Sequence, residues 1–452
     1  TNPDGCTWIE MLEDESKIGC HVALTPTWSE TAQWADYVLP MGLSAERHDL
    51  MSQETHAGTW LGFRQPVLRE YNRLEGLDSS DTRDSNPGEV WEEAEFYIAL
   101  TWEIDPDGSM GIRKYYESKE NPGQPISMDE YWSDVFSTVK GLPETAAAEG
   151  QTPLEYMRRR GAYSVPYAGQ KRYEEDDANG VELENGDRKK GFPTPSKKLE
   201  FFSKTLSEWS FDDQAIPGYI RSQVHWGNLD TEKGERCLLP TFRLPTLIHT
   251  RSGNAKWLQE ISHTNPLWVH PSDIGSLGLA NGELARVSTS IGYFVVRVWE
   301  TEGIHPGVVG CSHHVGRWRL YQDIGGQKIC SDLVDIERGE GTFLFRAKNA
   351  ERSYDSSDPD TSRVWWKEVG VNQNLTFGVQ PDPASGMQCW HQKVRVEPAH
   401  EGDRYADVFV DTNKSIEVYE EWKALTRPPT GKLRRPLWLN RPLKPLPEAY
   451  RL

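Results

Sequence analysis

The pattern of hydrophobic and polar positions changes along the chain from short mixed elements to helices and then to strands. Near the start, two apolar runs at 21–24 and 36–40 flank the segment 31–35, which predicts a strand, a brief helix and a strand. The second run stops at Pro40, which cannot continue a strand ladder. Strands separated in this way are typical of a parallel α/β sheet. We therefore interpret residues 1–45 as the end of such a domain, whose earlier strands the sequence does not include.

The segment 46–227 combines helical periodicity with polar loops, and we predict a mixed α+β domain. Helices are expected at 89–104, 127–139 and 152–160. Asn86 is the expected N-cap of the first helix, because Pro87 and Glu89 follow it. The arginines at 158–160 are expected to complement the dipole of the third helix, in preference to binding an anion. For Glu46 and His48 a structural salt bridge is favoured over a role near a substrate.

From about residue 228 the pattern becomes that of strands. Apolar or alternating runs at 283–288 and 293–300 are joined by a turn at 289–292, and 307–310 reads as a further buried strand. The residues 270–273 are expected to cap a short helix at 274–277, which Gly278 ends. The segment 228–422 is therefore predicted to be a β-barrel that carries functional loops.

The end of the chain, 423–452, is rich in proline and in basic residues. It contains Lys423, Arg427, Lys432, Arg434, Arg435, Arg441, Lys444 and Arg451 against the acidic Glu448. Such a segment does not form a core of its own, so we expect it to lie extended across a surface of this chain or of a partner.

Charge and cysteine usage exclude several classes of protein. A formal charge of −19 argues against nucleic acid or an anionic membrane surface as the partner. The sequence contains no apolar run of about 18 residues, so no transmembrane segment is expected, and the first residues do not resemble a signal peptide. The cysteines, 6 in all, include no C-x-x-C pair, which disfavours a zinc site or an iron–sulfur cluster built from this chain. Scattered cysteines suit a cytoplasmic location, and a periplasmic location through a partner's signal stays open.

The loop that begins at His249 has the chemistry of an anion-binding site. Small polar residues let a backbone approach a ligand closely, and Arg251 supplies a forked cation for phosphate. The alternative is an ordinary capped turn before the helix-like segment that leads to Asn265.

Three stretches together resemble one family. They are SETAQWADYVLP at 29–40, HTRSGNAKWLQEISHTNPLWVHPSDIGSLGLANGELARV at 249–287, and Gly370-Val371-Asn372-Gln373-Asn374 followed by Asp382-Pro383 and Ser385-Gly386. In this order they resemble the molybdopterin oxidoreductases of the dimethyl sulfoxide reductase superfamily. The resemblance implies that 1–45 ends a Rossmann-like domain and that 228–422 is a six-stranded, double-psi-like barrel that binds a dinucleotide.

The resemblance also implies a cofactor, two molybdopterin guanine dinucleotides that chelate one molybdenum or tungsten ion through dithiolene sulfurs. The residues expected to bind it lie in three loops. They are His249, Thr250, Arg251, Ser252 and Asn254 in the first, His313, His314, Gly316 and Arg317 in the second, and Asn372, Gln373 and Asn374 in the third.

Two geometric expectations accompany these loops. If His313 and His314 lie on a strand, their rings point apart, which disfavours zinc and leaves a histidine pair satisfied at a strand end as the alternative. If Asn372 and Asn374 lie on a strand, period-2 geometry places them on one side, facing one ligand.

The sequence also departs from the family pattern. It contains neither the cysteine cluster that binds a [4Fe–4S] centre nor the residue that ligates the metal, so no catalytic residue and no protein metal ligand is assigned. We expect these on another polypeptide, or on a first half that was cleaved or left out of this chain. A separate partner would be joined through a large apolar boundary, and an iron–sulfur electron-transfer subunit would serve the assembly.

The motifs are nearest to the polysulfide, thiosulfate and arsenate reductase branch. That resemblance implies a two-electron transfer of an oxygen or sulfur atom on a small substrate, with electrons passing through iron–sulfur centres. A formate dehydrogenase catalytic subunit is the first alternative, because it uses the same cofactor pair. A non-catalytic scaffold paralogue in a redox complex is the second.

Overall fold

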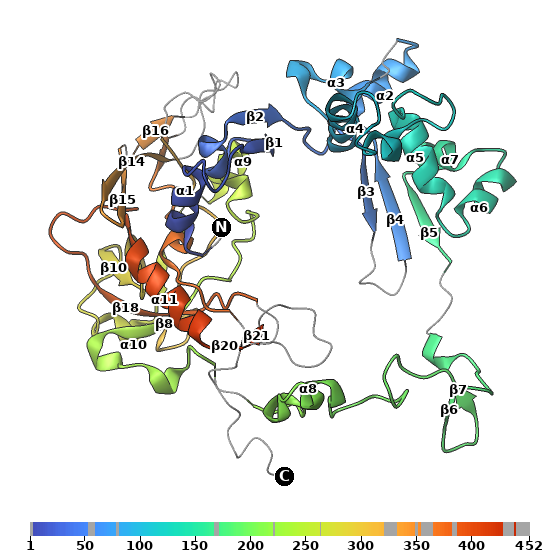
Figure 1. Cartoon of the computed structure of the whole chain (residues 1–452). Helices are drawn as coiled ribbons and strands as arrows, with labels where there is room; N and C mark the ends of the chain where they lie inside the picture. The colour runs from blue at the N-terminus through green and yellow to red at the C-terminus, as the bar shows by residue number, and fades with distance from the viewer. Residues whose placement is uncertain are drawn as a thin grey trace. The chain divides into compact units, whose positions relative to one another are not determined.

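The structure, a computed structural model, is shown in Figure 1. It describes residues 3–52, 59–77, 81–166, 171–219, 222–262, 264–320, 332–348, 351–353, 365–381, 387–427 and 438–439. The chain forms two compact units, one of Thr1–Cys20 with Phe201–Leu452 and one of His21–Glu200. The predicted domain boundaries at 45, 227 and 422 stay predictions.

A closed ring of six strands forms the centre of the first unit. The strands are β8 (Glu235–Leu239), β9 (Leu267–Val269), β10 (Leu284–Ser288), β11 (Gly292–Glu300), β12 (Val308–Gly310) and β18 (Gln392–Pro398). Around the ring the order is β10, β18, β8, β12, β9 and β11, and β11 pairs again with β10. Two of the six pairings, β8 with β12 and β9 with β11, are parallel. The predicted fold class, a mixed β-barrel beside α/β elements, is confirmed.

The barrel continues through β11 into further strands. Its first residues pair with β19 (Val408–Asp411), which is followed in the sheet by β15 (Thr342–Ala347), β14 (Asp332–Gly339) and β13 (Trp318–Arg319). The strand β11, nine residues long, therefore belongs to the ring and joins this extension through its first three residues. Helix α11 (Thr412–Ala424) begins directly after β19, where the side chain of Asp411 accepts the backbone N–H groups of Asn413 and Lys414.

The interior of the barrel explains the alternating pattern seen in the sequence. In β10 the buried positions are Ala285 and Val287, and in β18 they include Val394 and Val396, all at most 2% exposed. Strands with period-2 burial place one face on the core and the other toward solvent. The predicted strands at 283–288 and 293–300 with their hairpin are confirmed within one residue.

Strand direction brings the segments after β8 and β12 to one end of the barrel. These two strands are parallel, so their carboxyl ends, at Leu239 and Gly310, lie together. Strand β9 pairs antiparallel with β12 at Trp268, so the residues that precede β9 lie at the same end. The loops that follow 239 and 310 therefore meet the segment before 267.

Shorter elements complete the first unit. They are α1 (Gly5–Leu12), α8 (Lys204–Glu208), η5 (Asp212–Gln214), η6 (Trp226–Asn228), η7 (Thr231–Lys233), η8 (Arg251–Asn254), α9 (Lys256–Ile261), α10 (Pro271–Ile274), β16 (Glu351–Ser353), β17 (Trp365–Lys367), η10 (Gln373–Thr376), β20 (Thr426–Arg427) and β21 (Trp438–Leu439). His270 caps α10, but the helix starts at Pro271, three residues earlier than the predicted 274–277. Within the described part of the basic tail, β20 pairs with β21. None of the helices described here is long and apolar enough to cross a bilayer.

The second unit begins with the predicted strand, helix and strand. Strands β1 (Val22–Thr25) and β2 (Tyr37–Pro40) pair in parallel, and η1 (Thr31–Trp34) between them is a 3₁₀ turn. An antiparallel sheet of β3 (Asp49–Ser52), β4 (Thr59–Arg64) and β5 (Ala162–Val165) follows. The other elements are α2 (Val67–Leu74), α3 (Thr82–Ser85), η2 (Pro87–Glu89), α4 (Glu93–Ile104), η3 (Arg113–Tyr116), α5 (Met128–Ser137), α6 (Leu142–Ala148), α7 (Pro153–Arg160), η4 (Lys171–Tyr173), β6 (Val181–Glu182) and β7 (Arg188–Lys189).

Two of the three predicted helices of this unit start as expected, and the third does not. Ser127 caps α5, and Thr152 with Glu155 forms the capping box of α7. The predicted start at Asn86 is wrong, because Gly88 and Glu89 have φ values of 69° and 58°, which end a helix. The Asn86 side chain donates instead to the carbonyl oxygens of Glu46 and Val90, and α4 begins at Glu93.

His48 has a structural partner, as favoured, but this partner is Glu92, while the Glu46 carboxylate accepts the Leu43 N–H. The Nδ1 atom of His48 lies 2.9 Å from the Glu92 carboxylate, and both side chains are buried. Burial alone would raise the pKa of Glu92, but hydrogen bonds from His48 and Thr82 bring it below its ordinary value. The rings of Phe63 and Trp132 lie against the His48 imidazole. The arginines of α7 are paired as well, Arg158 with Asp129 and Arg160 with Glu149.

Glu95 provides a test of how this unit depends on pH. Burial, with the charges of Asp81 and Glu92, raises its pKa to about 7. Because this folded-state pKa exceeds the unfolded value, the unit loses stability as pH rises from about 4.5 through 7. Glu95→Gln, which keeps a hydrogen-bond acceptor for the helix start, should therefore raise the free energy of unfolding at pH 8 by about 2 kcal/mol and leave it unchanged at pH 4. Urea denaturation at both pH values measures this difference. Glu93→Gln, on the exposed side of the same helical turn, is the control, and an equal effect of both variants would contradict the assignment.

Candidate functional site

The first predicted loop leaves the barrel after β8 and turns at His249. This residue has a φ of 49°, in the left-handed region that few residues other than glycine adopt. The 3₁₀ turn η8 follows, with the carbonyl of Thr250 accepting the Gly253 N–H and the buried Ser252 hydroxyl accepting the Ile248 N–H at 2.9 Å. Arg251 is exposed at the start of the turn. Asn254 ends it, and the side chain of Asn254 lies outside the described part of the structure.

The second predicted loop brings two histidines against His249. Ring centroids of His313 and His314 are 4.4 Å apart, and that of His249 lies 4.8 Å from the first and 5.7 Å from the second. The expectation that the adjacent rings point apart is wrong, because residues 313–314 form a bend and not a strand. The three imidazoles therefore form one cluster, from exposed His249 to fully buried His314.

Hydrogen bonds assign the tautomer of each histidine in this cluster. His313 Nδ1 lies 2.8 Å from the carbonyl oxygen of Pro240 and must donate, so His313 Nε2 accepts from His249 Nδ1 at 2.7 Å. The Ser312 hydroxyl donates to the Phe242 carbonyl, so His314 Nδ1, 2.7 Å from that hydroxyl oxygen, donates to it. His314 Nε2 then carries a lone pair in the interior of the protein.

The surroundings favour the uncharged form of the two rings of the second loop. Burial is the main cause that lowers the pKa of His313, and it lowers the pKa of His314 to about 4, assisted by the neighbouring histidines and Arg243. Arg243 Nη1 lies 3.3 Å from His249 Nε2, which accepts in this tautomer. At neutral pH His313 and His314 are therefore neutral donors and acceptors beside an arginine charge.

The third predicted loop packs against the second through two glycines. Gly316 and Gly370 both have a φ of 91°, and the Gly316 N–H donates to the Val369 carbonyl. A Cβ on Gly316 would lie 2.2 Å from the carbonyl carbon of Val371. Only the absence of a side chain allows this close approach of the two backbones.

Asn372, Gln373 and Asn374 lie where this third loop becomes the turn η10. Asn372 precedes the turn, and Gln373 and Asn374 are buried in it. The expectation that Asn372 and Asn374 share one side of a strand is wrong, because a 3₁₀ turn has about three residues per turn and separates positions two apart. Gln373 Nε2 donates to the Cys311 carbonyl at 2.6 Å, which joins the third loop to the second.

Asn265, which was not among the predicted site residues, connects the second and third loops. Its carboxamide nitrogen donates to the Ser312 carbonyl at 2.7 Å, and its carboxamide oxygen accepts the Val371 N–H at 3.0 Å. The side chain is 1% exposed. Sequence reasoning placed Asn265 in a family motif without a role, and its position directly before a buried strand was the available signal.

Gly253 and Arg317 connect the first loop to the second. A Cβ on Gly253 would lie 2.9 Å from the Arg317 Cγ and Cδ atoms, so the aliphatic part of Arg317 lies over the first loop. Arg317 is 6% exposed. Gln259, in helix α9, donates from Nε2 to the Gly253 carbonyl at 2.7 Å. All three predicted loops thus meet at one end of the barrel.

The residues gathered here fit a large polar ligand that carries both anionic and donor groups. Arg251, Arg317 and Arg243 supply positive charge, and the loop backbones approach closely at glycines. Several buried polar atoms of these loops, such as His314 Nε2, have no hydrogen-bond partner among the described residues. The part of the third motif at Asp382, Pro383, Ser385 and Gly386 lies outside the described residues. Among the residues the structure describes, no group of three or more His, Cys, Asp or Glu side chains is arranged to hold a metal ion.

Comparison with known proteins identifies the domain family of the barrel. Residues 238–354 match the family model described as "Molydopterin dinucleotide binding domain". The chain is 40% identical over 356 residues to a putative catalytic chain of dimethyl sulfoxide reductase from Halobacterium salinarum, a match that covers 76% of this chain and 34% of the relative. The chain belongs to the molybdopterin oxidoreductases of the dimethyl sulfoxide reductase superfamily.

Other members of the superfamily align over a similar span. The arsenate respiratory reductase molybdopterin-containing subunit of Chrysiogenes arsenatis is 23% identical, over 70% of this chain and 38% of the relative. The trimethylamine-N-oxide reductase of Haemophilus influenzae is 22% identical, over 78% of this chain and 39% of the relative. The acetylene hydratase of Pelobacter acetylenicus shares the fold, with a TM-score of 0.53 at 16% identity over 88% of this chain and 42% of that one. This superfamily member thus spans well under half the length of these relatives.

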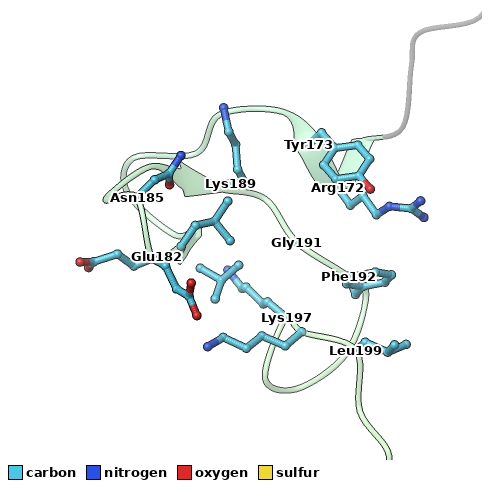
Figure 2. Close-up of a pocket in the computed structure, with 13 residues that line it drawn as sticks. Arg172, Tyr173, Glu182, Asn185, Lys189, Gly191, Phe192, Lys197 and Leu199 are labelled. Carbon is cyan, nitrogen blue, oxygen red and sulfur yellow. The ribbon is translucent and has the colours of Figure 1, made fainter.

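The second unit contains a cavity that involves none of the predicted residues. Its volume is about 580 Å³, and it lies between the hairpin of β6 and β7 and the loop that follows it. Figure 2 shows Tyr173, Phe192 and Leu199 around it, with the charged side chains of Glu182 and Lys197. The cavity does not include any residue of the barrel loops.

Gly316→Ala tests the close approach of the second and third loops. The new Cβ would collide with the backbone of Val371 and Asn372, so the variant should lose about 3 kcal/mol of stability, part of it from strain at positive φ. Gly402→Ala is the matched control, because Gly402 has a φ of 90° but no neighbouring atom within 4 Å of a Cβ. Urea denaturation of both variants separates the collision from the strain. Equal losses would show that the two loops do not approach each other as described.

Proposed function

We propose that this chain supplies the dinucleotide-binding part of a molybdenum or tungsten oxidoreductase that carries two molybdopterin guanine dinucleotides. The observation that supports it most directly is the match of residues 238–354 to a dinucleotide-binding domain, because the three predicted loops converge at one end of the barrel that this segment helps to build. When bound, such a cofactor supplies a metal that exchanges two electrons together with an oxygen or sulfur atom.

The side chains of this chain would bind and orient the cofactor. Arg251 and Arg317 offer forked cations for its phosphates, and the N–H groups of the 249–254 turn offer donors to the same oxygens. His313 and His314 are held as neutral rings beside His249, which suits contacts to uncharged ring atoms. Thr250, Ser252 and Asn254 in the first loop, Gly316 in the second, and Asn372, Gln373 and Asn374 in the third complete the proposed binding set.

For the reaction, we propose the polysulfide, thiosulfate and arsenate reductase branch, in which an oxygen or sulfur atom is removed from a small substrate. The arsenate respiratory reductase among the relatives supports this branch. Reduction of an S-oxide or N-oxide is the second candidate, because the relative with 40% identity is a putative dimethyl sulfoxide reductase. A formate dehydrogenase and a non-catalytic scaffold paralogue are the alternatives that experiment must exclude.

The proposal includes a polypeptide that supplies the rest of the relatives' length. It would carry the metal ligand and a [4Fe–4S] cluster, and an iron–sulfur subunit would deliver electrons. We propose a cytoplasmic location, supported by the scattered cysteines, of which Cys6, Cys20, Cys237, Cys311 and Cys389 are free thiols.

Metal and pterin content tests the proposal against the scaffold alternative. The purified assembly that contains this chain should hold about one molybdenum or tungsten ion and two pterins. Elemental analysis measures the metal, and the fluorescence of oxidised pterin measures the cofactor. Reduction of arsenate, thiosulfate, polysulfide and dimethyl sulfoxide with a reduced viologen dye would then separate the branches. An assembly without metal and pterin would support the scaffold paralogue, and formate oxidation without oxyanion or sulfur reduction would support the formate dehydrogenase.

Arg251→Ala tests the phosphate contact of the first loop. A charge-assisted contact contributes about 1.5–3 kcal/mol, so the variant should retain about tenfold less dinucleotide after purification, with an unchanged melting temperature of the cofactor-free protein. Arg395→Ala is the matched control, because Arg395 is an exposed barrel arginine paired with Glu397. Pterin fluorescence per mole of protein provides the measurement. Retention equal to that of the control variant would remove Arg251 from the site.

A further inference from the structure

Helix α1 packs on the turn that carries the third loop. It lies against η10 and α11 within the first unit, and Figure 1 shows α1 beside α11. The backbone N–H of Asp4 donates to the carbonyl oxygen of Phe377, the residue that follows η10, at 2.8 Å. Cys6 and Ile9 are 0% and 4% exposed, whereas Trp8 is 47% exposed. The helix is therefore docked through one of its faces.

The closest approach of α1 to the third loop is at Gly5, the first residue of the helix. A Cβ on Gly5 would lie 2.4 Å from Leu375 Cδ2, so the helix backbone touches the Leu375 side chain directly. Leu375 is 7% exposed, and together with Arg317 and Asn372 it lines a small cavity of about 20 Å³. Leu375 therefore contacts α1 and also borders the space beside two of the proposed cofactor-binding residues.

Two acidic side chains attach the rest of α1 to the extension of the barrel. The Glu10 carboxylate accepts from the Thr412 hydroxyl at the start of α11, at 3.1 Å. Glu13 forms a bidentate ion pair with Arg338 of β14, with N–O distances of 2.7 and 2.8 Å. The helix is thus attached to the sheet extension at one end and to the third loop at the other.

The last residues of the third loop depend on contacts of this kind. Asn265 and Gln373 hold the start and the middle of the loop. Residues 375–377 are held by α1 and by the Thr289 hydroxyl, which donates to the Thr376 carbonyl. Hydrogen bonds within a 3₁₀ turn have poor geometry, so the orientation of η10 depends on what its end packs against.

We propose that α1 is a positioning element for the third loop, and that docking of α1 and binding of the cofactor stabilise each other. The inference rests on the proposed function, because it concerns the loop that carries Asn372, Gln373 and Asn374. It makes Asp4 and Gly5 positioning residues, outside the proposed binding set. If both events favour one arrangement of the loop, each must favour the other by the same factor.

The thiol of Cys6 reports whether α1 is docked. Burial, with the charges of Asp4 and Glu10, raises the pKa of this thiol, and a buried thiol reacts only when the helix leaves the barrel. Cys20, which is exposed at the other end of the same segment, reacts without such an opening. Labelling with N-ethylmaleimide, followed by mass spectrometry of both peptides, therefore measures how often α1 undocks.

The cofactor-loaded assembly that contains this chain is compared with the same assembly from cells that cannot make molybdopterin. Cys6 should react about tenfold more slowly in the loaded assembly, and Cys20 at the same rate in both. Cys237, in strand β8, reports opening of the barrel itself. Equal rates at Cys6 with and without cofactor would overturn the inference, since a helix that serves stability alone docks equally in both. Equal slowing at Cys6 and Cys237 would overturn it as well.

Gly5→Val tests the same coupling from the side of the helix. The added side chain must displace Leu375, so the assembly should retain about tenfold less pterin. Gly19→Val is the matched control, because a Cβ on Gly19 meets only a backbone oxygen at 3.9 Å. Leu375→Ala makes room for the new side chain, so the double variant should retain several-fold more pterin than Gly5→Val alone. Retention of Gly5→Val equal to the control, or no gain in the double variant, would overturn the inference.

These outcomes differ from a failure of the proposed function. A cofactor-loaded assembly with the expected pterin content, combined with equal labelling of Cys6, would refute only the role of α1. An assembly of the unchanged protein without pterin would refute the proposed function, and the inference with it.

Discussion

The carboxamide of Asn265 is the contact on which the arrangement of the loops depends. It bonds to Ser312 in one loop and to Val371 in another, and it is held in place by a proline and a buried strand that follow directly. A buried amide that satisfies both its donor and its acceptor is costly to replace, because truncation leaves several backbone groups without partners. Asn265 thereby fixes how the two loops lie against each other. The close contacts of Gly316 and Gly370, and the hydrogen bond from Gln373 to the Cys311 carbonyl, form within this arrangement.

Local patterns explain why much of this fold could be predicted from the sequence. Alternating burial in β10 is a local pattern, and so are the helix starts at Ser127 and Thr152, where one side chain caps its own helix. The helix start at Asn86 was predicted wrongly. The Asn86 side chain does not cap a helix but donates to the carbonyl oxygen of Glu46, 40 residues away in sequence. Ring closure of the barrel joins β8 to β18, and no local signal marks that pairing.

The candidate site was predictable as a set of loops but not as a geometry. The motifs named His249, His313 and His314, yet their contact depends on two bends and on the left-handed conformation of His249. Asn265 and Gln259 act through carboxamide bonds to backbone atoms of other segments, which residue type alone does not reveal. The interpretation of 372–374 failed because strand periodicity was applied to a 3₁₀ turn.

The closed ring also sets an order of events during synthesis. Strand β8 pairs in parallel with β12, which follows about 70 residues later in the sequence. Its other neighbour, β18, is complete only at Pro398. Until that residue has left the ribosome, one edge of β8 and one edge of β10 have no strand beside them. Unpaired edges attract other strands, so a nascent barrel is exposed to misassembly for most of its translation. A dinucleotide that contacts all three loops can therefore be inserted stably only after the last loop has been made and the ring has closed.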